Sequence, residues 1–60
     1  MMENRTVWTV RYKDSTGTVR KAEYFCLTEN QARKMFTADN GNREIISVMD
    51  WREDMRRNGK

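Results

Sequence analysis

The sequence has no histidine and a single cysteine, Cys26. A structural zinc site needs about four ligands, usually Cys and His side chains, so one copy of this chain cannot supply it. A single cysteine also excludes a disulfide framework within the chain. Small secreted domains usually depend on such crosslinks, and their absence favours a reducing, intracellular setting. We therefore predict a cytoplasmic protein without a metal or other cofactor.

Proline and long apolar runs are also absent. The longest apolar run covers residues 24–27, which is far too short to cross a membrane or to form the core of a secretion signal. With 60 residues and no proline-containing linker, the chain has room for one small domain. Such a domain buries little of its surface, so its stability alone is marginal. We expect one domain and no membrane partner.

Charge of neither sign dominates the sequence. There are 12 Lys and Arg residues against 9 Asp and Glu residues, which gives a net charge of +3, and the two signs are interleaved along the chain. Dedicated duplex-DNA-binding proteins more often carry a basic stripe from which acidic residues are kept away. The charge is therefore compatible with a nucleic-acid partner but does not indicate one.

Two segments alternate between side chains of different character. In residues 6–13, Trp8, Val10 and Tyr12 fall on one face, and residues 19–27 alternate similarly, which predicts two strands. The sequence Asp-Ser-Thr-Gly at residues 14–17 combines residues that bond their own backbone with a glycine that tolerates a positive φ. These segments therefore predict a hairpin.

A helix and a third strand follow the hairpin. Thr28 and Gln31 have the spacing of a capping box, and Asn40-Gly41 is a helix-ending pair, so we predict a helix between them. Residues 43–49 alternate again and predict a strand. The order β-β-α-β predicts an α+β fold. Its three-stranded antiparallel or mixed sheet would have the first strand in the centre and the helix on one face.

The predicted elements divide the chain into a folded core and a C-terminal tail. Residues 6–49 should form the ββαβ core, and residues 50–60 a basic C-terminal helix or tail. Apolar side chains that share the helix-covered side of the sheet should form the hydrophobic core. They are Trp8, Val10, Ala22, Tyr24, Cys26, Ala32, Met35, Phe36, Ile46 and Val48.

The tail repeats the start signal of a helix. Asp50 and Glu53 have capping-box spacing, and Trp51 and Met55 are four residues apart, on one helical face. A helix this short is marginal in water without packing. It could therefore fray, or form only on a partner.

The opposite face of the sheet should carry apolar side chains as well. Those on the strands are Val7, Val19, Phe25, Leu27, Ile45 and Met49, and the tail adds Trp51 and Met55. This is too much apolar area to leave in water on a small monomer. The terminal helix could fold back over the face, two copies could pack sheet to sheet as a dimer, or another protein could bind there.

The reactive side chains of the sequence do not form a recognisable catalytic or phosphate-binding site. A nucleophilic cysteine needs a base or a helix N-terminus to lower its pKa, and Cys26 falls on the predicted core face of a chain without histidine. The carboxylates form no acid–base motif, and the three glycines are isolated, so no phosphate-binding loop exists. We predict that the protein is not an enzyme.

Basic residues near the hairpin loop and in the tail provide an alternative. With the aromatic residues of the hairpin they could form a ribbon for nucleic acid, or else protect a strand edge from aggregation. The candidates for contact with nucleic acid are Arg11, Lys13, Arg20, Lys21, Arg56 and Arg57.

The pattern Ala-x-Tyr-x-Cys-x-Thr-x-x-x-Ala at 22–32, followed by Met35-Phe36 and Glu-Ile-Ile-Ser-Val at 44–48, resembles a known group. Many very small proteins of phages and mobile elements run strand, strand, helix, strand in this way. The resemblance spans residues 6–49 and implies a regulatory or host-interaction role in the host cytoplasm. Inhibitors of bacterial immunity are one member of that class. The segment from Trp8 to Gly17 also looks like arm-type DNA-binding domains of phage integrases, which have three strands before the helix where this chain has two.

These patterns together predict a non-enzymatic protein-interaction module. We expect a homodimer, from a phage or mobile element, that regulates or inhibits a host protein or binds a phage protein. The alternative is a small DNA- or RNA-binding regulator that uses the basic hairpin.

Overall fold

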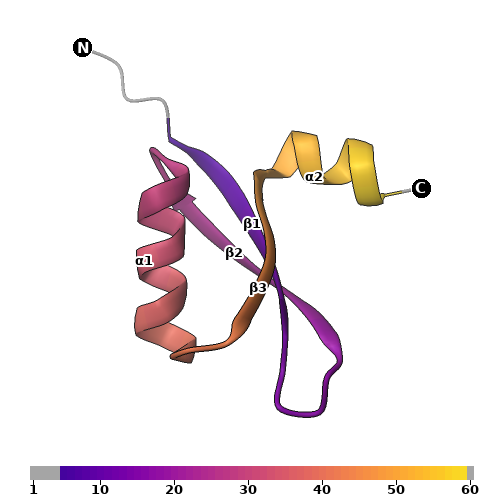
Figure 1. The fold of residues 1–60 in the computed structure, drawn as a ribbon. Helices are drawn as coiled ribbons and strands as arrows, with labels where there is room; N and C mark the ends of the chain where they lie inside the picture. Colours follow the sequence, from indigo (N-terminus) through magenta and orange to yellow (C-terminus); the bar gives the residue numbers. More distant parts are fainter. Residues whose placement is uncertain (1–4, 60) are drawn as a thin grey trace.

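The computed structural model describes residues 5–59. Along the chain lie β1 (Thr6–Lys13), β2 (Val19–Cys26), α1 (Glu29–Asn40), β3 (Glu44–Asp50) and α2 (Trp51–Asn58) (Figure 1). This is an α+β fold, and the predicted order of the first four elements is confirmed. The tail forms a second helix.

The three strands form one open antiparallel sheet in the order β2-β1-β3. The central position predicted for the first strand is therefore confirmed. Val10, in the middle of β1, lies opposite Ala22 on β2 and Val48 on β3. The two outer strands each leave one edge of the sheet without a partner strand among residues 5–59. Figure 1 shows α1 beside the sheet, with α2 at its other side.

The hydrophobic core lies between α1 and the sheet. Phe36 is fully buried, and its ring lies 4.8 Å from the ring of Tyr12, measured between centroids. The buried core residues are Val10, Cys26, Ala32, Phe36 and Val48, with Trp8, Tyr12, Ala22, Tyr24 and Ile45 packed partly buried against them. Most of the predicted core is therefore present.

A β-bulge corrects the prediction for the third strand. Arg11 lies opposite Ser47 but the next residue, Tyr12, lies opposite Ile45, so Ile46 is the extra residue in β3. The bulge reverses the alternation, so that Ile45 packs against the core and the side chain of Ile46 is 48% exposed. The predictions that placed Ile46 in the core and Ile45 on the opposite face were wrong.

The prediction for Met35 was wrong as well. Ala32 and Phe36 are four residues apart and both fully buried, which fixes the face that α1 turns to the sheet. Met35 lies on the flank of that face, and its side chain is 41% exposed.

The ends of both helices follow the predicted capping signals. The Thr28 hydroxyl accepts a hydrogen bond from the backbone N–H of Gln31, and the Gln31 side-chain oxygen accepts one from the N–H of Leu27. Gly41, with φ of 75°, ends α1. The Asp50 carboxylate accepts from two N–H groups in the first turn of α2.

The hairpin loop is organised by Asp14. Its carboxylate accepts hydrogen bonds from the Thr16 hydroxyl, from the Arg20 guanidinium and from the backbone N–H groups of Thr16 and Thr18. These bonds, that of the Thr16 hydroxyl above all, lower the pKa of Asp14. Gly17 supplies the positive φ, 82°, that closes the loop.

The structure shows the first of the three predicted arrangements for the part of the opposite face that β1 and β3 form: the terminal helix folds back over it. α2 lies against β1 and β3 on the side away from α1, and it buries Thr9 of β1 beneath it. The part of the face that belongs to β2 stays outside this cover. The side of α2 that meets the sheet is not its apolar one, because Asp54 is the buried residue of the helix.

Candidate functional site

An ion pair holds α2 on the sheet. The guanidinium of Arg11, in the central strand, donates two hydrogen bonds to the Asp54 carboxylate, with N–O distances of 2.7 and 2.8 Å. The side-chain amide of Asn58 donates a third, at 3.0 Å. The Asp54 side chain is 4% exposed and that of Arg11 26%. Since a bidentate pair fixes both distance and orientation, it positions α2 over β1.

The pair also sets the charge state of the buried carboxyl. The hydrogen bond from Arg11 lowers the pKa of Asp54, against the opposing effect of burial, and the same bond raises the pKa of Arg11. Asp54 is therefore ionised in the folded protein at neutral pH.

We expect stability to fall on acidification in a way that depends on Asp54. Because its pKa is lower in the folded chain than in the unfolded chain, its contribution is present above the unfolded value of about 4 and is lost as pH falls through the folded value. Asp54→Asn should be less stable at neutral pH and should lose less stability between neutral and acidic pH. Urea unfolding over a pH series measures this.

The other carboxyls provide the control for that comparison. Asp14 and Glu53 also have lowered pKa values, but both proteins contain them, so they cancel in the difference. Parallel stability curves for the two proteins would contradict the role assigned to Asp54.

A groove of about 200 Å³ opens beside the ion pair. Its floor is the buried pair of residues Thr9 and Asp54, one wall comes from α2 and the other from the edge strand β2. The lining residues are Val7, Thr9, Lys21, Glu23, Trp51, Asp54 and Met55. We call it the α2 groove.

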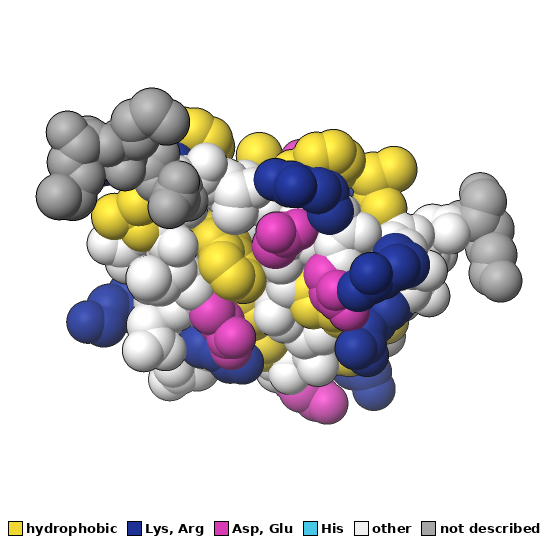
Figure 2. Space-filling view, turned by 90° about the horizontal axis from the view of Figure 1, so that it is seen from above, with side chains coloured by type: hydrophobic (Ala, Val, Ile, Leu, Met, Phe, Trp, Pro, Cys, Tyr) yellow, Lys and Arg dark blue, Asp and Glu magenta, His cyan; other side chains and the backbone are white. Residues whose placement is uncertain are grey.

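Apolar side chains extend this groove into a larger patch. Trp51 and Met55 stand exposed on α2, the latter 58% exposed, and Val7 lies across the groove from them. Phe25, 62% exposed, is directly opposite Val7 on β2, so the apolar surface continues to the sheet edge. We call these four residues the apolar patch. Figure 2 shows hydrophobic side chains gathered along one border of the molecule with basic side chains among them.

Arg52 lies next to the patch. Its guanidinium carbon is 5.7 Å from the centroid of the Trp51 ring, within the range of a cation–π contact. This contact favours one orientation of an otherwise exposed indole.

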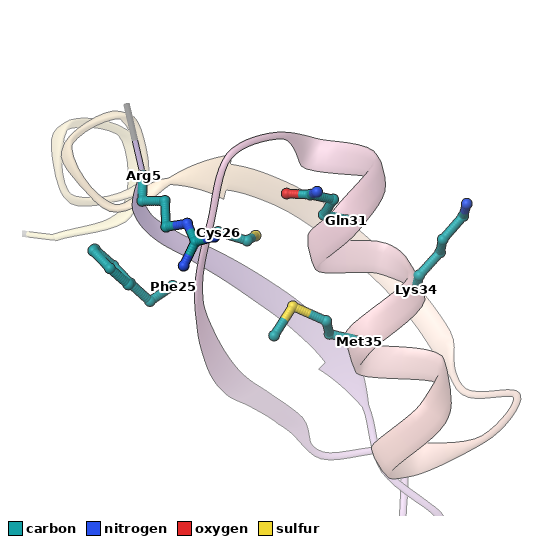
Figure 3. A pocket seen from close by; sticks show the side chains of 6 residues that line it. All are labelled: Arg5, Phe25, Cys26, Gln31, Lys34 and Met35. Carbon is teal, nitrogen blue, oxygen red and sulfur yellow. The ribbon is translucent and has the colours of Figure 1, made fainter. Parts of the chain in front are cut away.

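A second groove, of about 330 Å³, lies between the end of β2 and α1. In Figure 3, Phe25 and Arg5 lie on one side, and Gln31 and Met35 on the other. Cys26, at the middle, is buried, and its thiol donates to the Thr28 carbonyl at 3.5 Å. Lys34 completes the lining. The cysteine thus has the packing role that its place in the sequence predicts.

The structure brings together some of the residues predicted for partner binding. Val7, Trp51 and Met55 share one groove, and Phe25 adjoins it. Val19 lies at the opposite end of β2 from Phe25, and Leu27 is exposed beyond that strand. Met49 is half-buried on β3, and Ile45 belongs to the core.

Most of the predicted nucleic-acid contacts are ion-paired. Arg11 pairs with Asp54, Arg20 with Asp14, and Lys21 with Glu23 at 3.9 Å. Arg56 and Arg57 both pair with Glu53. Lys13 lies at the end of β1, opposite Glu44. These carboxylates reduce the positive potential that a phosphate backbone would meet.

Sequence reasoning missed Asp54 and Thr9. One signal pointed to Asp54. Arg11 lies in the middle of the central strand, where a partly buried charge is tolerated only if the element that covers the strand supplies a group of opposite charge. Asp54 and Asn58 are four residues apart and thus share one side of α2.

No family model, curated protein or solved structure matches this chain. Within residues 5–59, no group of three or more acidic or cysteine side chains is placed to hold a metal ion. Neither helix is long and apolar enough to cross a membrane.

Proposed function

We propose that this protein is a non-enzymatic protein-interaction module whose contact surface is the apolar patch with the α2 groove. The observation that carries this is the exposure of Trp51, Met55 and Phe25 around one groove. Aromatic side chains and methionine are enriched in protein interfaces, and such side chains fill the centres of contact surfaces.

The groove suits an apolar segment of another protein. Its α2 wall offers Trp51 and the flexible Met55, which adapts to a partner's shape. The β2 wall offers Lys21 and Glu23, which can bond polar groups at the rim of the contact. The floor is rigid because Asp54 is held by Arg11. The resemblance to small phage and mobile-element proteins makes a host protein the proposed partner.

The nucleic-acid alternative is weaker on this surface. Five of the six candidate contacts lie in ion pairs with carboxylates, whose negative charge opposes the approach of a phosphate group. Salt distinguishes the two proposals, since binding to nucleic acid weakens steeply with salt and binding at an apolar groove does not.

The test is a matched pair of substitutions. Met55→Lys places a charge in the apolar patch, whereas Ile46→Lys places the same charge at a comparably exposed position on β3 outside it. Host lysate, with and without nuclease treatment, is passed over immobilised wild type and each variant. We expect a protein retained by wild type and Ile46→Lys at raised salt, and lost from Met55→Lys. Retention by Met55→Lys would overturn the assignment of this surface, and loss after nuclease treatment would favour the alternative.

A further inference from the structure

The outer edge of β2 has backbone groups directed at solvent. The N–H of Asp14 donates to the carbonyl of Thr18 at 2.9 Å, which makes this pair a hydrogen-bonded one in the antiparallel ladder. Every second residue of β2 then bonds β1 in the same way. The residues between them direct their N–H and C=O groups outward, away from β1. They are Val19, Lys21, Glu23 and Phe25.

The side chains of these four residues form a symmetric sequence. All four lie on the α2 side of the sheet, since successive side chains of a strand alternate. Val19 and Phe25, both more than half exposed, are the outer members. Lys21 and Glu23, of opposite charge, are the inner members. Ala22 is at the centre, three residues from each apolar end.

We propose that a second copy of this chain pairs with the edge of β2, antiparallel, about a two-fold axis at Ala22. In this register Lys21 lies opposite the partner's Glu23, and Glu23 opposite the partner's Lys21. Val19 lies opposite the partner's Phe25. About eight main-chain hydrogen bonds form, and the two sheets become one sheet of six strands. This association uses the strand edge, because α2 occupies the face where two sheets would otherwise stack.

Charge selects this register over its neighbours. Moving the axis to Lys21 places that lysine opposite its own copy, and moving it to Glu23 places two carboxylates opposite each other. Like charges directly opposite are destabilising, whereas opposite charges stabilise a pair of strands. A two-fold axis midway between two neighbouring residues would pair a residue whose N–H and C=O groups point outward with one whose groups point toward β1. Such a pair cannot form the hydrogen bonds of the ladder. Ala22 is therefore the centre that satisfies both charge and hydrogen bonding.

The helices leave room for the pairing. α1 contacts all three strands of its own sheet, so the two copies of α1 would lie over the two halves of the six-stranded sheet. The central strands of these halves, the two copies of β1, are three strand spacings apart, about 14 Å. Packed helices need axes about 8–10 Å apart, so the two copies of α1 fit side by side on one face. α2 lies over β1 and β3, away from the shared edge.

Reversal and restoration of charge test the proposal in the full chain. Sedimentation equilibrium should give a wild-type dimer whose dissociation constant rises about tenfold or more in Lys21→Glu and in Glu23→Lys, because each makes two like-charge pairs. The double variant Lys21→Glu/Glu23→Lys should return to the wild-type value. Arg33→Glu, which breaks the exposed Arg33–Glu29 pair on α1, is the control and should leave the dimer unchanged.

A crosslink tests the register directly. Ala22→Cys should form a covalent dimer on mild oxidation, because the two copies of residue 22 are opposite each other. Val19→Cys should not, because its opposite residue is the partner's Phe25. Met55→Lys should still dimerise, which separates this association from the proposed binding function. A monomeric wild type at millimolar concentration, equal dimerisation of all charge variants, or crosslinking by Val19→Cys but not Ala22→Cys would overturn the proposal.

Discussion

Phe36→Ala is expected to remove a large part of the protein's free energy of unfolding at 25 °C. The Phe36 side chain is fully buried and lies against Tyr12. Truncating a buried phenylalanine to alanine costs about 3–5 kcal/mol, since apolar contacts are lost and a cavity remains. A domain of 60 residues has a total stability of about 3–9 kcal/mol. Circular dichroism with urea titration measures the loss.

The neighbouring residue supplies the control. Met35→Ala changes a side chain that is 41% exposed on the flank of the same helix, so we expect a loss below about 1 kcal/mol. A similar loss in both variants would show that the two side chains share the core. That result would contradict the placement of Met35.

The order of the elements could be predicted because local signals mark their ends. Thr28, Gly41 and Asp50 each bond or bend the backbone within a few residues of their own position, so their role can be read without knowing the fold. Alternation in residues 6–13 gave the faces of the central strand correctly, because neighbours on both sides fix its conformation.

The face of the sheet to which each isoleucine of β3 points could not be predicted, because it depends on how β3 pairs with β1. Ile45 and Ile46 are chemically identical, and a bulge opposite Arg11 and Tyr12 decides which of them faces α1. A shift of one residue moves every later side chain to the other face of a strand. The sequence of β3 alone contains no glycine or other signal for that bulge.

The candidate site was only partly predictable for a related reason. Trp51 and Met55 were predicted from their spacing to share one face of a helix, and the structure places both beside Val7. The polar contact that seats the helix joins residues 43 positions apart, Arg11 and Asp54. Each of these could have paired with many other charges, so spacing along the chain could not select the pair.

Replacing one member of the Arg11–Asp54 pair should lower the free energy of unfolding more than replacing both. Asp54→Leu leaves the Arg11 guanidinium partly buried without its carboxylate, and we expect a loss of about 2–3 kcal/mol, toward the lower end for buried pairs because Arg11 is 26% exposed. Arg11→Met leaves the Asp54 carboxylate, 4% exposed, with Asn58 as its remaining hydrogen-bond donor, and should cost about 3 kcal/mol or more.

The double variant Arg11→Met/Asp54→Leu should recover most of this loss. It removes both charges together and replaces them with apolar side chains of similar length, which pack between β1 and α2 without an unpaired ion. Urea unfolding of the four proteins gives the coupling energy, which should exceed about 1 kcal/mol because the two groups are in direct contact. Losses that simply add would mean that each side chain acts alone. In that case the contact between the two groups would add no stability of its own, and α2 would be held on the sheet by other contacts.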